Sequence, residues 1–277
     1  MDNVLGYAGK RVIVSGAASG MGAATTALLV ELGAEVHAVD IKKPDTTGLA
    51  SFTETDLREP AEIDAAVRRI GKIVDCLFNC AGLPNTFSNL DVMLVNFCGL
   101  RHLTETVIPN MVEGGAIASI ASSAGIGWLM NMDVLGELLA TPDFAAARAW
   151  CEEHPREIAN GYGVSKEAIN AYTAVRSFTL ARLGIRINCL NPGPTDTPMM
   201  PHFEQAVGKD FMANFPKPLW GRNARPEEQA WPLLFLNSPR ASFVTGVQFD
   251  ADAGFRAGMF TGQIDPAAII PDGMRQL

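Results

Sequence analysis

Short apolar runs alternate with longer segments of helical periodicity along the chain. The apolar runs are rich in β-branched residues and predict buried strands. They lie at residues 11–16, 35–40, 51–56, 75–82, 116–123, 185–193 and 246–252. The longer segments predict helices at 23–34, 60–70 and around 90–112. Strands that alternate with helices form βαβ units, so the pattern predicts an α/β fold: a seven-stranded parallel sheet, doubly wound, with helices on both faces.

Composition and charge narrow the class of protein. Apolar residues make up 48% of the 277 positions, which is ample for a core, and no repeat, low-complexity tract or linker divides the chain. We therefore expect one domain over residues 1–277. The formal net charge of -8 argues against a nucleic-acid surface. We expect no nucleic-acid partner.

Cellular location is predicted from the N-terminus, the apolar stretches and the cysteines. The start of the chain lacks the basic and apolar regions of a signal peptide, and the longest uncharged stretch, Gly114 to Met132, is interrupted by glycines, serines and an asparagine. The five cysteines are odd in number and mostly lie within apolar runs, which favours buried thiols in a reducing compartment. We expect a cytoplasmic protein without a membrane partner.

A glycine-rich turn follows the first predicted strand. The segment SGAASGMG places glycines at 16, 20 and 22, at the start of the first helix. Such a turn lets the backbone approach a pyrophosphate, which then lies at the helix N-terminus. The spacing is G-x-x-x-G-x-G rather than the commoner dinucleotide fingerprint. A purely structural turn is the alternative.

Asp40 ends the second predicted strand. A carboxylate at this position can accept hydrogen bonds from a ribose 2′-hydroxyl, and it would repel a 2′-phosphate. It therefore favours NAD over NADP, although Lys42 and Lys43 follow closely and weaken the inference. The alternative is an ordinary turn residue at the end of a strand.

Tyr162 and Lys166 form a candidate catalytic pair. They are four positions apart, so on a helix they share one face. A positive charge beside a phenol favours the phenolate and can lower its pKa from about 10 toward neutrality. Two residues that merely decorate a helix are the alternative, and the pair alone does not separate the two interpretations.

Several further motifs, in the same order along the chain, resemble the short-chain dehydrogenase/reductase family. The glycine turn matches with Ser15 in place of the usual threonine, NCAG carries Cys80 in place of the second asparagine of NNAG, and DAG at 252–254 replaces DGG. The other matching positions are Asp56-Leu57, Asn79 to Gly82, Asn96, Ser122, Tyr162, Lys166 and the segment NPGPTDT at 191–197. The resemblance covers nearly the whole chain and implies a Rossmann-type domain.

The resemblance implies a role for each of four catalytic residues. Tyr162 would be the general acid/base, and Lys166 would favour its phenolate and bind the nicotinamide ribose. Ser122 would donate a hydrogen bond to the substrate oxygen, with Ser123 ranked second. Asn96 would hold a water that links Lys166 to solvent. In the alternative interpretation, the Asn96 side chain only bonds the backbone of its own helix.

The resemblance also assigns the binding residues. Asp56 would contact adenine, and Thr197 would lie near the nicotinamide carboxamide. The full set for NAD is Gly16, Ser19, Gly20, Met21, Gly22, Asp40, Asp56, Leu57, Asn79, Ala81, Gly82, Tyr162, Lys166, Pro192, Gly193, Thr195 and Thr197. The set for the substrate is Ser122, Met199, Met200 and Phe203. The four histidines are scattered and no Cys/His spacing fits zinc, so we expect no metal site.

One departure from the family concerns the segment between Ser122 and Tyr162, which lie much closer together in most members. The insertion at about 126–160 predicts two helices, 131–140 and 142–153, with Pro142 in the first turn of the second. This arrangement is similar to a branch that includes bacterial 3α-hydroxysteroid dehydrogenase/carbonyl reductases and coniferyl-alcohol dehydrogenases. A passive surface excursion is the alternative to a functional insertion.

Subunit assembly is left open by the insertion. In the family the helix that carries Tyr162 and Lys166 commonly packs at a subunit interface, so a homodimer or homotetramer is expected. The insertion can cover either that interface or the substrate.

Apolar side chains indicate the class of substrate. The expected substrate loop, about 197–222, is rich in methionine and aromatic residues, and the insertion adds Trp128, Leu129, Met130 and Met132. Such side chains form adaptable walls for flat or bulky ligands. We therefore expect hydride transfer between NAD(H) and a hydrophobic alcohol/ketone pair: steroid-like, aryl or terpenoid. A dinucleotide-binding sensor without catalysis and an S-adenosylmethionine methyltransferase remain as alternatives, and the physiological substrate and direction stay open.

Overall fold

The seven predicted strands form a single parallel sheet in the computed structural model, which describes residues 4–265. The spatial order is β3-β2-β1-β4-β5-β6-β7. The strands are β1 (Arg11–Ser15), β2 (Glu35–Asp40), β3 (Ser51–Glu54), β4 (Val74–Asn79), β5 (Met111–Ile120), β6 (Arg186–Pro192) and β7 (Gln248–Ala251). The prediction of a seven-stranded, doubly wound Rossmann-type sheet is confirmed.

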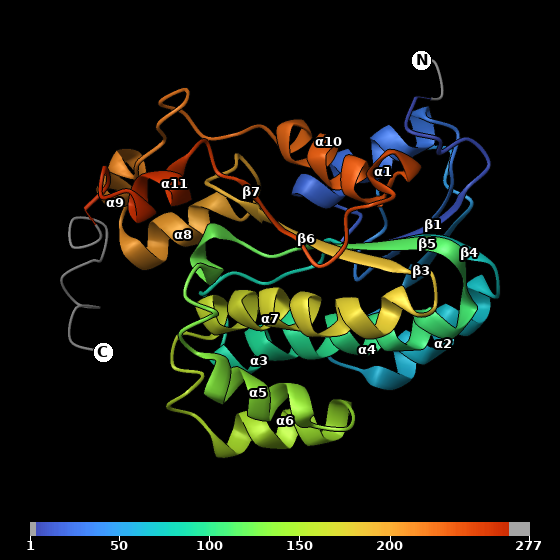
Figure 1. Ribbon diagram of the computed structural model, residues 1–277, viewed down its shortest axis with the longest axis horizontal. Coiled ribbons are helices and arrows are strands. Elements are labelled where there is room, and N and C mark those ends of the chain that lie inside the picture. Colours follow the sequence, from blue (N-terminus) through green and yellow to red (C-terminus); the bar gives the residue numbers. More distant parts are fainter. Residues whose placement is uncertain (1–3, 266–277) are drawn as a thin grey trace.

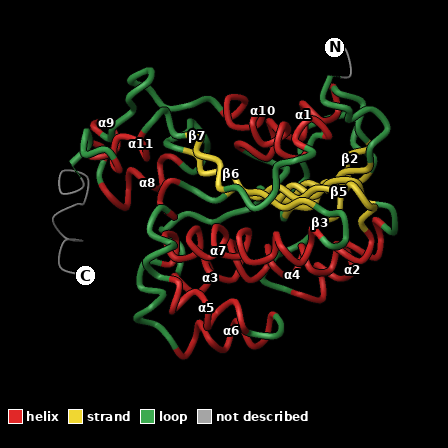
Figure 2. The backbone as a smooth tube through the Cα atoms, in the orientation of Figure 1, coloured by secondary structure: helices red, strands yellow, loops and turns green. Residues whose placement is uncertain are grey.

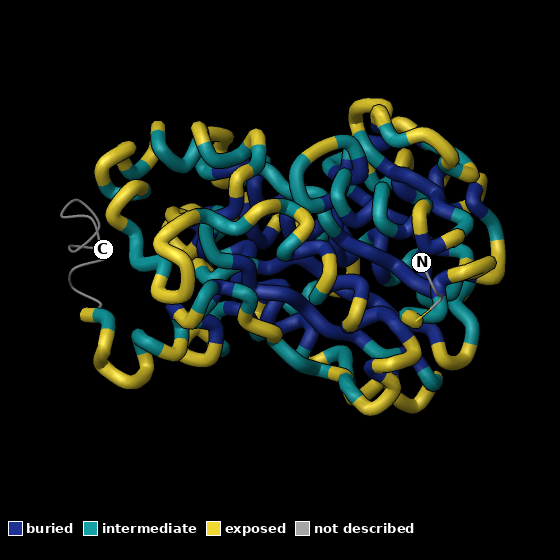
Figure 3. The backbone as a smooth tube through the Cα atoms, turned by 90° about the horizontal axis from the view of Figure 1, so that it is seen from above, coloured by how far each residue is buried: buried dark blue, intermediate teal, exposed yellow. Residues whose placement is uncertain are grey.

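Helices cover both faces of the sheet (Figures 1 and 2). One face carries α1 (Gly20–Glu31) and α10 (Pro226–Asn237). The other carries α2 (Pro60–Ile70), α3 (Asn89–Met93), a π-helical turn (Leu94–Gly99), α4 (Leu100–Val107) and α7 (Gly161–Ala181). Alternate strand residues supply two cores: Ile13 packs toward α2, α4 and α7, whereas Val12 and Val14 pack toward α1 and α10. The central strands are accordingly almost entirely buried, in the middle of the molecule (Figure 3).

The strand order places a crevice at the carboxyl ends of β1 and β4. These two strands are neighbours, with Ser15 aligned to Asn79, but the chain leaves them in opposite directions, toward β2 and toward β5. Ligands of open α/β sheets bind at such a switch point. The short helices α8 (Met200–Val207), α9 (Lys209–Asn214) and α11 (Phe255–Phe260) lie at this end of the molecule (Figure 1).

Strand ends differ from the predicted ones by up to five residues, and three helical segments also differ from the structure. Helix α1 begins at Gly20 rather than at 23, because the glycine turn leads directly into it. The long stretch around 90–112 is not one helix: α3, the π-helical turn, α4 and the short turn Ile108–Asn110 follow one another, and β5 begins at Met111. Helix α6 (Phe144–Glu153) begins after Pro142, because the carboxylate of Asp143 caps it by accepting the Ala146 N–H at 2.8 Å.

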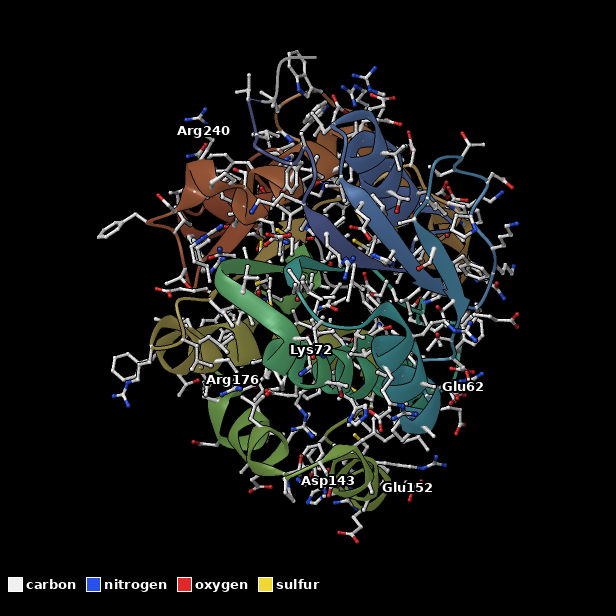
Figure 4. All side chains as sticks on the ribbon, turned by 90° about the vertical axis from the view of Figure 1, so that its right-hand side faces the viewer. Glu62, Lys72, Asp143, Glu152, Arg176 and Arg240 are labelled. Atoms are coloured by element: carbon white, nitrogen blue, oxygen red, sulfur yellow. The ribbon has the colours of Figure 1, made fainter. Side chains whose placement is uncertain are left out.

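The insertion forms α5 (Met132–Ala140) and α6, which pack on the outer side of α3 and α7, away from the sheet (Figure 1). In the side view, Asp143 and Glu152 mark α6 at the opposite end of the molecule from Arg240 (Figure 4). The guanidinium of Arg101, on α4, donates to the carbonyls of Leu138 and Asp143 and thereby holds the connection between the two helices.

The two helices of the insertion cover part of the outer face of α7. Just before them in the chain, Leu129 and Met130 are 65% and 87% exposed, whereas Trp128 belongs to the core. That the insertion covers the substrate stays a prediction. A homodimer or homotetramer stays a prediction. The part of α7 that the insertion covers cannot form the subunit interface of such an assembly.

Membrane-spanning helices and clusters of metal ligands are two further features that the structure can be searched for. Among residues 4–265, none of the helices combines the length and the apolar character that crossing a bilayer requires. Within the same range, no group of three or more histidine, cysteine, aspartate or glutamate side chains gathers as metal ligands would.

Candidate active site

A cavity of about 600 Å³ lies at the carboxyl ends of β1, β2 and β4. Its size is within the range of cofactor and small-molecule sites, roughly 300–1,000 Å³. Eleven of the residues predicted for the cofactor line it, together with the predicted substrate residue Met199. The eleven are Gly16, Ser19, Gly20, Met21, Gly22, Asp40, Asp56, Leu57, Ala81, Gly82 and Thr197.

The glycine turn packs so closely on the end of β4 that side chains are excluded. Gly16 has φ +69°, and a Cβ atom there would lie 2.4 Å from the backbone N of Ala81. A Cβ atom on Gly22 would lie 1.9 Å from the carbonyl oxygen of Gly16. The turn therefore brings bare backbone and the N-terminus of the 12-residue helix α1 to the cavity wall. This is the arrangement that accepts a pyrophosphate.

Asp40 lies beside the glycine turn and is held by two backbone donors. One carboxylate oxygen accepts the N–H of Ala18 and the other that of Lys42, both at 2.9 Å. Each oxygen keeps a further lone pair for a ligand hydroxyl. Lys42 and Lys43 also line this end of the cavity, so its charge is mixed.

Asp56 lines the cavity, but its carboxylate is engaged by Arg58. The guanidinium of Arg58 binds both oxygens of Asp56, with Nη2 at 2.6 Å from Oδ2, and also binds Asp91 at 3.1 Å. This hydrogen bonding is the main reason that the pKa of Asp56 lies below its usual value. Sequence analysis missed Arg58; its nearness to Asp56 in the sequence was the one available signal.

Asn96 clamps the loop that follows β4. Its Oδ1 accepts the Leu83 N–H at 2.6 Å, and its Nδ2 donates to the Leu83 carbonyl at 3.0 Å and to the hydroxyl of Ser165 at 3.2 Å. The side chain is fully buried within the π-helical turn, and it does not bond its own helix. Asn96 thus links the Gly82–Leu83 backbone to α7.

Ser122, Tyr162 and Lys166 meet beside this loop. The phenol of Tyr162 is near enough to Ser122 for the serine hydroxyl to lower its pKa, and the ammonium of Lys166 lies 5.6 Å from the centroid of the Tyr162 ring. Lys166 is only 4% exposed and donates to the Ile120 carbonyl at 2.9 Å. The helix α7 therefore brings the phenol and the ammonium to the end of β5, where Ser122 follows the strand.

Burial dominates the proton affinities of this pair. It raises the pKa of Tyr162 to about 12, against the opposite effect of the bond to Ser122. It lowers the pKa of Lys166 to about 8. The lowered tyrosine pKa expected from Lys166 is thus not found in the protein alone, where burial raises the pKa.

The remaining predicted residues lie outside the cavity. Asn79 is buried beneath it and donates to the hydroxyls of Thr104 and Ser119. Pro192, Gly193 and Thr195 are at the end of β6, where the Thr195 hydroxyl donates to the Gly193 carbonyl. Ser122, Asn96, Tyr162 and Lys166 also do not line it; they form the group described above.

Helix α8 carries two predicted substrate residues, Met200 and Phe203. The ring of Phe203 meets that of Tyr162 edge to face, with centroids 5.1 Å apart. His202, one residue earlier, pairs with the Thr86 hydroxyl at 2.8 Å. The substrate segment therefore touches both the catalytic tyrosine candidate and the loop after β4.

The sequence did not indicate eleven of the residues that line the cavity: Ala18, Val39, Ile41, Asp45, Thr55, Arg58, Cys80, Leu83, Phe87, Val95 and Pro198. Most of them lie within two positions of a residue that it did indicate. Phe87 is the clear exception, since it lies in a loop without a motif. Only the folded loop brings its ring to the cavity.

Comparison with known proteins identifies the family of the chain. Residues 10–133 match the family model described as short chain dehydrogenase, and residues 149–256 match the model described as Enoyl-(Acyl carrier protein) reductase. A coniferyl-alcohol dehydrogenase from a Pseudomonas species is 31% identical over 246 residues, which are 88% of this chain and 96% of that protein.

Two hydroxysteroid dehydrogenases are also similar. The 3-alpha-hydroxysteroid dehydrogenase/carbonyl reductase of Comamonas testosteroni is 31% identical over 90% of this chain and 97% of its own length. The crystal structure of the 3-alpha-hydroxysteroid dehydrogenase from Pseudomonas sp. B-0831 complexed with NADH superposes with a TM-score of 0.77 at 27% identity, covering 92% of this chain and 100% of that one. With motifs, fold and relatives in agreement, the chain belongs to the short-chain dehydrogenase/reductase family.

Proposed function

We propose that this protein is a dehydrogenase that transfers hydride between NAD(H) and a hydrophobic alcohol/ketone pair, with Tyr162 as the general acid/base. The observation that carries the proposal is the group Ser122, Tyr162 and Lys166, assembled beside a cavity that the glycine turn and Asp40 line. A sensor needs the cavity alone, and a methyltransferase has no use for the phenol and ammonium pair.

The cavity fits a dinucleotide in shape and in chemistry. Backbone at Gly16 and Gly22 leaves room for a pyrophosphate, and Asp40 presents acceptors to a ribose. Lys166 would bind the nicotinamide ribose, since Gly82 on the cavity wall lies close to its ammonium. The bound nicotinamide would supply or accept the hydride.

The chain's own residues would manage the proton that accompanies the hydride. Ser122 would donate to the substrate oxygen, and Tyr162 would exchange a proton with it. Lys166 carries its proton at pH 7, because its pKa of about 8 lies above that pH. Its charge and the positive ring of NAD⁺ would together have to offset the desolvation that raises the pKa of Tyr162.

Free thiols support a location in a reducing compartment. None of the five cysteines forms a disulfide, and all except Cys80 are buried. We accordingly propose a cytoplasmic enzyme.

Cofactor choice is the first test. We expect kcat/KM to favour NAD⁺ over NADP⁺ at least tenfold, because a charge-assisted bond to the ribose is worth roughly 1.5–3 kcal/mol. Asp40→Asn should remove most of this preference while keeping an acceptor for the backbone N–H groups of Ala18 or Lys42. Steady-state kinetics with both cofactors measures the effect. A wild-type preference for NADP⁺ would refute the assignment and would implicate Lys42 or Lys43.

Substrate class is the second test. We expect a ring-bearing secondary or aryl alcohol to exceed 2-propanol in kcat/KM by tens-fold, since another 100 Å² of buried apolar ligand contributes about 2.5 kcal/mol. Phe203→Ala should narrow that gap, because its ring lies against Tyr162. Phe243→Ala, which removes a fully exposed ring outside the substrate loop, is the control and should leave the gap unchanged. Equal kcat/KM values for the two alcohols would contradict the proposal.

A further inference from the structure

Asn170 is a buried polar residue on α7 that the proposed chemistry does not use. It lies one helical turn beyond Lys166, on the same face as Tyr162, and its exposed fraction is zero. Its Nδ2 donates to the carbonyl of Gly125 at 3.1 Å, and its Oδ1 accepts the thiol of Cys189 at 3.1 Å. Because a carbonyl can only accept, these partners fix the orientation of the amide.

The carbonyl that Asn170 binds belongs to the turn that carries Ser122. This turn, Ser123–Gly125, is closed by a bond from the Gly125 N–H to the Ser122 carbonyl at 2.9 Å. The Ser122 hydroxyl in turn accepts the Ala124 N–H at 3.1 Å. The position of that hydroxyl therefore depends on where the turn lies.

Helix α7 holds this segment on both sides of Ser122. Lys166 binds the carbonyl of Ile120, two residues before it, and Asn170 binds that of Gly125, three residues after it. The contact is close: a Cβ atom on Gly125 would lie 2.7 Å from Nδ2 of Asn170. The one other donor to the Gly125 carbonyl within the described residues is the Trp128 N–H, at 3.4 Å.

We propose that Asn170 is a positioning residue, which fixes the Ser122 hydroxyl relative to Tyr162 through the turn at 123–125. The proposal rests on the proposed function, in which Ser122 donates to the substrate oxygen. Asn170 touches neither the reacting atoms nor the cavity, so its effect has to pass through Ser122.

The test replaces Asn170 by leucine, which has nearly the same shape, and by serine, which is too short to reach the Gly125 carbonyl. Each variant should lower kcat about tenfold to a hundredfold, because small displacements of a reacting group have effects of this size. NADH affinity, measured by fluorescence titration, should stay within threefold. Should the leucine variant not fold, the smaller serine variant provides the result.

A matched control is available on β6. Asn188 is equally buried, donates to the Val244 carbonyl at 3.0 Å and accepts the Val247 N–H at 3.1 Å, away from Ser122. Asn188→Leu should lower the free energy of unfolding but leave kcat within threefold. An equal fall of kcat in this control would overturn the proposal, because general loosening would then explain both variants.

A double-mutant cycle separates positioning from other effects of Asn170. In a Ser122→Ala background, Asn170→Ser should lower kcat by less than twofold, since the hydroxyl that it positions is already absent. A fall as large as that in the wild-type background would overturn the proposal.

A readout without catalysis separates this proposal from the proposed function. Amide hydrogen exchange at residues 124–126 should accelerate at least tenfold in Asn170→Ser and not in Asn188→Leu. If Ser122→Ala leaves kcat unchanged, the proposed role of Ser122 fails, while faster exchange would still establish that Asn170 fixes the turn. Unchanged exchange would refute the positioning role.

Discussion

Tyr162→Phe should lower kcat by a factor of about 10²–10⁴, the range that a positioned acid/base group contributes. NADH affinity should stay within a few-fold of wild type, because the hydroxyl faces Ser122 and the ring faces Phe203, and neither lines the cofactor cavity. Single-turnover kinetics and fluorescence titration measure the two quantities separately.

The matched control for this substitution is Tyr172→Phe. Tyr172 lies on the same helix and is buried. Its hydroxyl donates to Glu105 Oε1 at 2.6 Å rather than interacting with Ser122. Its loss should reduce the free energy of unfolding and leave kcat within a few-fold. The acid/base assignment would be wrong if Tyr162→Phe kept more than a tenth of wild-type turnover.

Lys166→Met should abolish turnover, weaken NADH binding and yet stabilise the fold. Burial lowers the pKa of Lys166 to about 8 from its ordinary value near 10.5, so the buried ammonium opposes folding by about 3 kcal/mol at pH 7. Loss of the bond to the Ile120 carbonyl offsets about 1 kcal/mol of this gain. Urea unfolding at pH 7 should therefore give the variant a free energy of unfolding about 2 kcal/mol above that of wild type.

The sign of the pH dependence follows from the same pKa. Between pH 8 and 10.5 the unfolded chain holds the Lys166 proton while the folded chain releases it, so wild-type stability rises with pH relative to the variant. The difference between the two proteins should therefore shrink by pH 9.5. Lys10→Met is the control, because the bond to Asp75 raises the pKa of Lys10 and the ammonium there favours folding. A variant at position 166 that is less stable than wild type at pH 7 would contradict this account.

Local sequence patterns carried enough information for the sheet, and together with the family resemblance they indicated the candidate catalytic group. The strand pattern located all seven strands, and the five central ones are largely apolar because parallel strands inside the sheet are buried on both faces. The spacing of Tyr162 and Lys166 fixed their common face, and steric exclusion by the backbone accounts for glycine at positions 16 and 22. These features depend on a few neighbouring residues, so the chain displays them directly.

Contacts between distant segments were not predictable in the same way. Arg58 binds Asp91, which lies 33 positions further along the chain. The same guanidinium binds the carboxylate of Asp56. Phe87 reaches the cavity because Asn96 clamps the Leu83 backbone. The tyrosine pKa was predicted from charge alone, but its direction is set by burial, which a sequence does not display.

The helices of the insertion support α7 from the side opposite to the sheet, and this support is intramolecular. Asn131, at the start of α5, donates to Glu167 on α7 at 2.7 Å, and Arg101 ties the connection between α5 and α6 to α4. A contact within one chain does not dissociate on dilution, whereas a contact between copies does. The rigidity of the helix that carries Tyr162 and Lys166 is therefore, over its covered part, independent of protein concentration.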